Sequence, residues 1–481
     1  MVDRRNFISL AGLGGGGLLL NAFSSKLTAS TSIMDSSSNM EGSAKDLYRE
    51  IQSMPLDDSH CHPLTFKDAI TTPDDFVERF ALSAFPISLY FPNGVYDQWK
   101  SGNAKVKRKL DKQYKISDKR NEMLFHVKET VFVKYLVKSL AQYLDCEPSL
   151  DSVIDARNKQ GRNYTKYLKS LFKDANIGNA MLDMGYREGL DEKNLNKFKN
   201  AITPTKGRHI LRVDTILKDM MATDTSFDDM EAKLIADIEA GLDGTGNLGA
   251  KSYGMKSYLL PRLGLFKPLY DRNTAKKSWN NFIKAMKNGS LPSMHGGDRD
   301  ENWRIRKDAL RYLHSLALEM CMERDMPMQF HAGDGEPPRG ILRNQDPFDM
   351  EEMIRFDKDG LIRTPKIILI HAGYPNIGKA AWISHLYTNC YFEVSLATPL
   401  IHQGMLRMYL EAMEVVPLTK ILFGSDAYHI PEFYWLAAKW GRIFLSQALA
   451  VYVDANILTE DEAIKAAKRI LFQNNRRVYN I

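Results

Sequence analysis

Two histidines separated by one residue are the first feature of the sequence that could perform chemistry. His60 and His62 stand in the run Asp-Ser-His-Cys-His-Pro, with Cys61 between them. If this run ends a β-strand, the alternation of side chains places both imidazoles on one face and the cysteine on the other. Two imidazoles on one face can bind a single metal ion, whereas the cysteine is expected to be a small buried residue.

Three further residues could complete a metal site, because each follows a short apolar run and precedes turn residues. His331 stands in "QFHAG", His371 in "LIHAGYP" and Asp426 in "LFGSDAYH". A single histidine at the end of a strand is more often a structural polar residue than a ligand. The joint pattern of a His-x-His pair, two His-Ala-Gly ends and a Gly-Ser-Asp end, in this order, favours a metal site.

Short apolar runs that alternate with helical patterns could position these residues. Four of the runs are apolar at nearly every position, as expected for strands buried on both faces of a parallel sheet, and four are weaker. The eight predicted strands cover residues 54–62, 179–186, 209–217, 252–260, 326–333, 366–375, 390–396 and 420–429. Eight strands alternating with helices predict an α/β fold, the (β/α)₈ TIM barrel, in which the strand ends converge on one mouth.

The rest of the sequence predicts one barrel domain that is preceded by an N-terminal extension. The barrel domain is expected to cover residues 46–481. The helical pattern of residues from about 90 to 175 predicts an insertion after the first strand, because this segment is too long for an ordinary connection. Residues 31–45 are rich in serine and predict a linker.

Residues 1–30 have the order of a twin-arginine signal peptide. Arg4 and Arg5 precede a weakly apolar, glycine-rich run over residues 7–23. This run is shorter than the about 20 strongly apolar residues that a spanning helix needs, so we expect no stable membrane insertion. The signal predicts a periplasmic or exported protein, and the alternatives are a helix at the start of the chain or an uncleaved anchor.

The composition excludes several other classes of protein. Lys plus Arg number 65 against 59 for Asp plus Glu, and the formal charge of +6 is spread over 481 residues, which does not indicate nucleic-acid binding. The four cysteines lack the spacing of a zinc ribbon or a disulfide scaffold. We therefore expect a small-molecule substrate as the partner, and the sequence leaves a homo-oligomer open.

The order His60, His62, His331, His371 and Asp426 resembles the amidohydrolase superfamily of metal-dependent barrel enzymes. The segments "HCHPLT", "QFHAG", "HAGYP", "YFEVS" and "LFGSDA" are similar to the amidohydrolase-related branch that includes the N-terminal domain of FluG and of plant nodulin-type glutamine-synthetase fusions. The resemblance implies that His60, His62 and His331 are metal ligands. It also implies that Asp426 is a ligand and proton acceptor, and that His371 is either a second-metal ligand or a free catalytic histidine.

The cofactor that the resemblance implies is one divalent metal ion. Imidazole and carboxylate donors suit zinc, and manganese or iron are alternatives. Two-metal members bridge their ions with a Lys or Glu of the fourth strand, and Lys256 stands where such a lysine could be. A substrate-binding or salt-bridging lysine is an equally good interpretation. Arg212 and Arg262 are the other candidates for binding a substrate carboxylate, although a surface salt bridge is the commoner role of an arginine.

These residues predict a metal-dependent hydrolase in which a metal-activated water attacks an amide or ester bond of a small substrate. A metal-dependent non-oxidative decarboxylase or carbon–carbon lyase is the alternative, and release of CO₂ would distinguish it. A sugar-acid isomerase and a non-catalytic metal-binding protein are further alternatives. His371 in "HAGYP" argues against an isomerase. The presence of both His371 and Asp426 argues against a non-catalytic metal-binding protein, because metal binding alone needs neither a proton acceptor nor a group that polarises the substrate.

Overall fold

The computed structural model describes most of the chain that follows the N-terminal extension. The described residues are 40–81, 87–92, 94–185, 191–221, 225–246, 249–288, 305–333, 342–355, 365–395 and 400–481. The predicted export signal lies outside these residues, and the first described helix, α3 (Gly42–Ile51), begins within the segment predicted as a linker. Within the described ranges, no helix combines the length and the apolar character that a membrane span requires.

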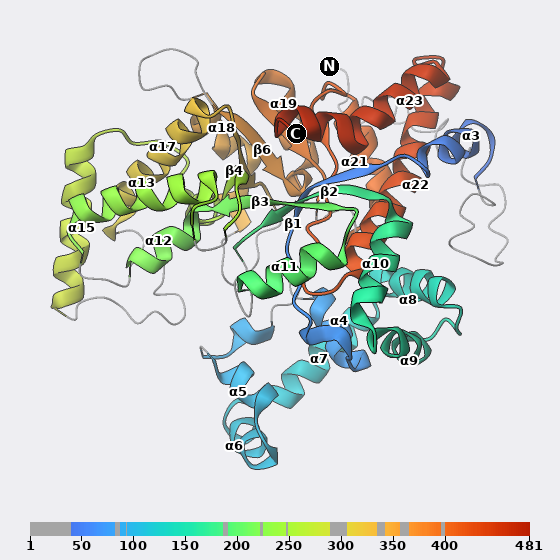
Figure 1. The fold of residues 1–481 in the computed structure, drawn as a ribbon, viewed down its shortest axis with the longest axis horizontal. Coiled ribbons are helices and arrows are strands. Elements are labelled where there is room, and N and C mark those ends of the chain that lie inside the picture. Colours follow the sequence, from blue (N-terminus) through green and yellow to red (C-terminus); the bar gives the residue numbers. More distant parts are fainter. Residues whose placement is uncertain are drawn as a thin grey trace, which may run out of the picture.

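Eight parallel strands follow one another around a barrel in chain order (Figure 1). They are β1 (Leu56–Cys61), β2 (Ile177–Asp183), β3 (Lys206–Arg212), β4 (Ser252–Ser257), β5 (Pro327–His331), β6 (Lys366–Ile370), β7 (Cys390–Glu393) and β8 (Ile421–Leu422). Backbone hydrogen bonds join the last strand to the first: the Ser59 N–H donates to the Phe423 carbonyl at 2.9 Å, and the Asp426 N–H donates to the His60 carbonyl at 2.7 Å. The predicted (β/α)₈ barrel is confirmed.

Helices cover the outside of the barrel and alternate with its strands from β2 onward. They are α11 (Glu192–Ala201), α12 (Val213–Met221), α13 (Phe227–Asp243), α14 (Leu259–Leu263), α15 (Arg272–Lys287), α17 (Lys307–Glu323), α18 (Glu351–Ile354), α19 (Ile377–Leu386), α21 (Gly404–Met413), α22 (Glu432–Asp454), α23 (Glu460–Lys468) and α24 (Asn474–Val478). The long helix α22 is buried around most of its circumference, because it packs against α3, α10 (Tyr164–Ala175) and α21, and its Gly441 lies against Phe423 of the barrel.

All eight strands end earlier than the sequence predicts, and in two of them the predicted strand runs into a helix. The predicted strand 209–217 ends at Arg212, where α12 begins, and the predicted strand 252–260 ends at Ser257, just before α14. A continuous apolar run does not by itself distinguish a buried strand from a buried helix, which explains both errors. The correction places Arg212 and Lys256 near the C-terminal ends of their strands, at the mouth of the barrel.

The helical insertion predicted after the first strand is also confirmed. It contains α4 (Pro73–Ala81), α5 (Val95–Ser101), α6 (Ala104–Tyr114), α7 (Ile116–Lys128), α8 (Val131–Leu144), α9 (Leu150–Gly161) and α10 (Tyr164–Ala175). Figure 1 shows α5 and α6 projecting away from the strands. A fully buried ion pair joins the insertion to the barrel, since Arg157 Nε of α9 donates to Glu432 Oε1 of α22 at 2.6 Å.

The C-terminal residues fill the end of the barrel opposite the mouth. Tyr479 follows α24 and packs in a cluster with Met181, Ile210, Ile368 and Leu422, which come from four strands. The Tyr479 hydroxyl accepts a hydrogen bond from Gln329 Nε2 at 2.6 Å. The C-terminal residues thus occupy the bottom of the barrel, and the candidate site lies at the opposite end, at the C-terminal ends of the strands, where barrel enzymes place their chemistry.

Candidate metal centre

The segments that follow β6 and β8 each contain a residue in an unusual backbone conformation, and its side chain lies in the mouth of the barrel. His371 has φ 73° and Asp426 has φ 50°, so both lie in the left-handed region. This conformation costs a residue with a β-carbon about 1–2 kcal/mol, and such residues are concentrated at functional sites. The bond from the Asp426 N–H to the His60 carbonyl holds the second turn in place.

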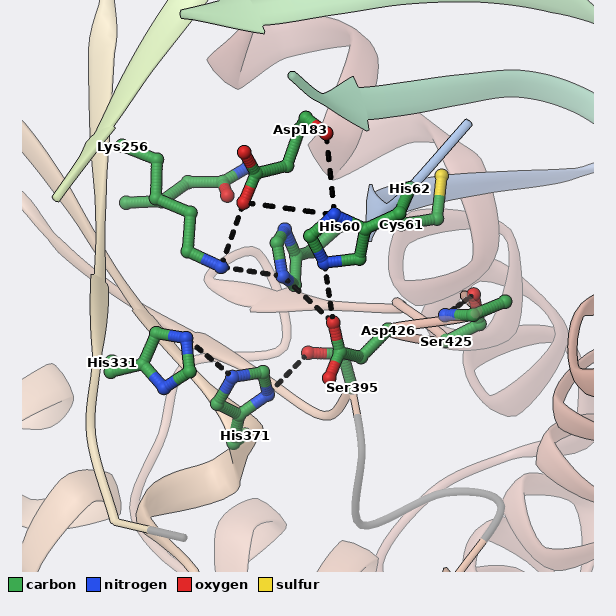
Figure 2. A network of polar contacts seen from close by, with 12 residues as sticks. His60, Cys61, His62, Asp183, Lys256, His331, His371, Ser395, Ser425 and Asp426 are labelled. Atoms are coloured by element: carbon green, nitrogen blue, oxygen red, sulfur yellow. Dashed lines mark hydrogen bonds and ion pairs between the residues drawn. The ribbon is translucent and has the colours of Figure 1, made fainter. Parts of the chain in front are cut away.

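All five residues that the sequence predicts for the metal site meet at this mouth (Figure 2). Asp426 Oδ1 lies 3.0 Å from His60 Nε2 and 3.1 Å from His62 Nε2. His331 Nε2 lies 3.4 Å from His371 Nε2, and the rings of His60 and His371 have centroids 5.6 Å apart. All five side chains are buried. Five side chains that are far apart in the sequence therefore lie close together in the structure.

The geometry of this group fits a divalent ion. Ligand atoms bound to one ion at about 2.0–2.2 Å lie roughly 3 Å or slightly more from one another, as these nitrogens and oxygens do. Among the described residues, His60, His371 and Asp426 each present one ligand atom within 4.8 Å of the other two, and so do His60, His62 and Asp183. His331 belongs to neither of these groups and adjoins the cluster through His371.

The protonation states also suit a metal ion. Burial lowers the pKa of His60 to about 4 and the pKa values of His331 and His371 well below the usual range, so these imidazoles are neutral at pH 7. Neutral imidazole is the form that binds metals. Burial opposes the ionisation of Asp426, but hydrogen bonds from His60 and His62 outweigh it and hold the Asp426 pKa well below its usual range. The cluster therefore combines neutral nitrogen donors with one carboxylate.

Lys256 lies inside the cluster. Its Nζ is 2.8 Å from His60 Nε2 and 3.0 Å from Asp183 Oδ2, and the side chain is fully buried. Burial lowers the pKa of Lys256. Arg212 also reaches Asp183, since its Nε donates to Asp183 Oδ1 at 3.0 Å and its Nη2 contacts the other oxygen. Lys256 and Arg212 are predicted to bind a substrate carboxylate. Both contact Asp183 here, and these contacts do not test substrate binding, which stays a prediction.

Arg262, the third predicted substrate-binding residue, belongs to α14. Its side chain lies outside the described part of the structure, so its role also stays a prediction.

Asp183 is a site residue that the sequence reasoning missed. It ends β2, is fully buried, and its carbonyl oxygen contacts His62 Nδ1 at 3.2 Å. Burial opposes the ionisation of Asp183, but the charges of Arg212 and Lys256 hold its pKa well below the usual range. Its position in a predicted strand shortly before a glycine, in "MLDMG", was the signal that could have found it.

Glu393 and Ser395 at the end of β7 form a second missed group, although "YFEVS" contributes to the family resemblance. His371 Nδ1 lies 2.9 Å from Ser395 Oγ, and that hydroxyl donates to Glu393 Oε2 at 2.6 Å. The Ser59 hydroxyl donates to the other oxygen, Glu393 Oε1, at 2.9 Å. These contacts connect β1, β6 and β7 behind the imidazole of His371.

The insertion contributes charged groups to one side of the mouth. Burial, then the charges of Arg79, His62 and Lys100, lower the pKa of His429 to about 3. Arg79 belongs to α4 and Lys100 to α5, so two helices of the insertion approach the residues after β8. Cys61, in contrast, points away from the mouth as predicted, since its Sγ contacts the carbonyl oxygen of Met181 and is buried.

Comparisons with known proteins agree with this geometry. Residues 287–481, which contain His331, His371 and Asp426, match the model of the family described as amidohydrolase. This part of the chain is therefore similar to that family. Protein fluG from Emericella nidulans is 27% identical to this chain over 233 residues. That match covers 47% of this chain and 25% of fluG, so the chain spans about a quarter of the length of this relative.

Solved structures share the barrel fold over nearly the whole chain. A Lactobacillus casei protein assigned as a metal-dependent hydrolase has a TM-score of 0.64 at 21% identity, and the match covers 90% of this chain and 97% of that one. The uronate isomerase from Thermotoga maritima has a TM-score of 0.58 at 13% identity, covering 91% and 97%. The glucuronate isomerase from Caulobacter crescentus has a TM-score of 0.56 at 12% identity, covering 95% and 96%. At these identities the likeness concerns the fold.

Proposed function

We propose that the chain is a metal-dependent hydrolase that opens an amide or ester bond of a small substrate. The convergence of His60 and His62 on Asp426 carries the proposal. Asp426 Oδ1 lies 3.0 Å from His60 Nε2 and 3.1 Å from His62 Nε2, and all three side chains are buried. Two imidazole nitrogens and one carboxylate oxygen at these distances form a set of ligands that suits a divalent cation.

The chain's own residues have distinct roles in the proposed reaction. His60, His62 and Asp426 would hold the ion, with His331 and His371 adjoining them. A divalent cation held there supplies Lewis-acid chemistry. Asp426 is ionised at neutral pH, so its carboxylate can accept a proton from the water that attacks the substrate. Nitrogen and carboxylate donors favour one zinc ion, and manganese or iron are alternatives.

Isotopically labelled water tests the proposal against the alternatives. Zinc-reconstituted protein is incubated in oxygen-18 water with small amides, esters, and aromatic or enol acids, and the products are analysed by mass spectrometry. Hydrolysis places one labelled oxygen in the acid product, and the Asp426→Asn variant should lose this turnover. A decarboxylase would release CO₂ instead, without labelled oxygen in the remaining fragment. Turnover without incorporation of the label would overturn the hydrolase proposal.

A sugar-acid isomerase is the second candidate, because uronate isomerases share the fold over more than nine-tenths of the chain. This reaction moves hydrogen within the substrate and cleaves no bond to a leaving group. Conversion of an aldehyde-form uronate into its keto isomer, measured by NMR, would favour it over the hydrolase. Absence of that conversion in zinc- and manganese-loaded protein, together with hydrolysis of a panel member, would exclude it.

We also propose that Arg4 and Arg5 direct the folded protein to the twin-arginine export route. Folding before export is compatible with a cofactor that binds inside a closed barrel. The test is a fusion of residues 1–39 to a reporter that is active only after export of the folded form. Replacement of both arginines by lysine should abolish reporter export, and unchanged export would contradict the proposal.

A further inference from the structure

The outer part of the insertion is strongly basic. Residues 94–128, which form α5, α6 and α7, contain ten Lys and Arg against four Asp and Glu, an excess as large as that of the whole chain. Three of these bases, Lys100, Arg120 and Lys128, form ion pairs with acidic residues of α4, and five of the other seven belong to α6. The positive charge is therefore concentrated in this region, contrary to the expectation of an even spread.

One face of α6 is formed by basic side chains alone. Lys105, Arg108, Lys109 and Lys112 follow the spacing i, i+3, i+4 and i+7, which places them on the same side of the helix, and we call them the basic face. All four residues are exposed, and in the described part of the chain none of them forms an ion pair. Asp111, the acidic residue of α6, accepts hydrogen bonds from Ser117 instead. The four charges of the basic face are therefore available to a partner.

The opposite side of α6 anchors the helix to the insertion. Leu110 is buried there, and the Lys107 ammonium lies 5.3 Å from the centre of the Trp99 ring of α5. The Trp99 ring stacks in turn on Tyr96, with centroids 5.7 Å apart. The basic face is thus held on a packed support, in the part of the fold that projects away from the barrel (Figure 1).

The composition of the basic face indicates the kind of partner that it fits. Four cations without an acidic neighbour on the same face select an anionic surface. Protein interfaces are depleted in lysine, and nucleic-acid recognition relies on arginine and on aromatic rings that stack on bases, whereas the basic face has three lysines, one arginine and no aromatic residue. Clusters of about four to eight Lys and Arg on a helix are typical of contacts with anionic lipids. The face extends for about 10 Å along the helix, so it can contact several headgroups of a flat membrane at once.

We propose that the basic face of α6 binds the surface of a membrane that contains anionic phospholipids. The contact is electrostatic and leaves the hydrocarbon core of the membrane untouched, because α6 uses its apolar side to pack within the insertion. Each lysine close to such a surface strengthens binding by about fivefold, so the basic face suffices for reversible attachment. This partner lies beyond the proposed hydrolase reaction and does not depend on it.

Sedimentation with lipid vesicles tests the proposal. The full chain is mixed at about 0.1 M salt with vesicles of phosphatidylcholine alone, or with vesicles that also contain the anionic lipid phosphatidylglycerol, and the bound fraction is measured in the pellet. We expect stronger binding to the anionic vesicles. We also expect that binding to be lost at about 1 M salt, where the screening length falls to about 3 Å.

Variants of the basic face separate its effect from that of the overall charge. Replacement of its three lysines by glutamine should weaken binding to the anionic vesicles by about 100-fold, whereas their replacement by arginine should preserve it. The matched control removes three exposed lysines at similar spacing from α10, a helix that packs against α22, and consists of Lys166→Gln, Lys169→Gln and Lys173→Gln. The control has the same net charge as the glutamine variant of the basic face and should bind like the wild type.

A second readout locates the contact, because the apolar residues 7–23 can bind lipid on their own. A dye attached at Gln113→Cys of α6 should be quenched by a lipid that carries a quencher on its headgroup, and more strongly than a dye at Thr165→Cys of α10. Equal quenching at the two positions, or equal loss of binding in the two glutamine variants, would overturn the proposal. Binding to duplex DNA at the same salt without binding to anionic vesicles would also overturn it, and would assign the basic face to a nucleic acid.

Discussion

His62 and Asp426 lie 364 positions apart in the chain, yet His62 Nε2 is 3.1 Å from Asp426 Oδ1. Backbone pairing produces this contact, because the Asp426 N–H donates to the His60 carbonyl at 2.7 Å and the His62 N–H donates to the Ala427 carbonyl at 2.8 Å. The two side chains are therefore held by the closure of the barrel. A site built on paired backbone is preorganised for its ligand.

Replacement of Asp426 by asparagine should lower turnover while the protein stays folded. The amide has nearly the same shape but cannot accept a proton from water, so we expect kcat to fall by about 10²–10⁴-fold. Turnover of the best panel substrate and the melting temperature are the measurements. Asp228→Asn, a change at an exposed carboxylate of α13, is the control and should leave kcat unchanged. Wild-type kcat in Asp426→Asn would contradict the assigned role.

Replacement of Gly424 by alanine should displace Glu393 and destabilise the protein. The added β-carbon would lie 1.6 Å from Glu393 Oε1 in a fully buried region, and such overpacking costs typically 1–3 kcal/mol. Urea unfolding measures the loss of stability, and zinc affinity should fall as well. Gly404→Ala is the matched control, since the atoms nearest to its β-carbon lie at 3.4 Å. Equal stability of the two variants would show that Glu393 is not fixed where we place it.

His402 should make the stability of the protein dependent on pH. Its ring stacks on Tyr135 with centroids 3.3 Å apart, and burial lowers the pKa of His402 from 6.5 to about 4. As the pH falls below 6.5, the unfolded chain binds this proton before the folded protein does, so the stabilising contribution present above pH 6.5 is lost progressively down to about pH 4.

The phenylalanine variant isolates this effect, because His402→Phe keeps an aromatic ring and removes the titration. Between pH 7 and pH 4 the wild type should lose on the order of 3 kcal/mol more of its free energy of unfolding than the variant does. Urea unfolding at a series of pH values measures both proteins, and all other titrating groups cancel in the comparison. Parallel curves would show that His402 does not titrate between these limits.

The sequence predicts the barrel and its five central side chains because both depend on local patterns. Apolar runs that end in His-Ala-Gly or Gly-Ser-Asp identify strand ends, and the topology of a parallel barrel then brings all such ends to one mouth. This reasoning places His331, His371 and Asp426 together without any knowledge of their contacts. It fails for the end of β3 because the apolar pattern continues from the strand into α12.

The groups behind the central residues could not be predicted in the same way, because their roles depend on neighbours across the barrel. Ser59 and Glu393 are 334 positions apart, and no local pattern indicates their hydrogen bond. The contact of Lys256 with His60 likewise requires the register between β1 and β4. Glu393 in "YFEVS" resembles an ordinary acidic residue of a strand until its burial is known.

Metal binding by variants of the His-x-His pair tests the central claim most directly. Purified protein is dialysed against zinc and then against buffer, and the bound metal is measured by mass spectrometry. We expect one ion per wild-type chain and none in the double variant His60→Asn and His62→Asn, whereas His126→Asn, at an exposed histidine of α7, should bind zinc like the wild type. A wild-type chain that retains no metal, or a double variant that retains as much, would contradict the account.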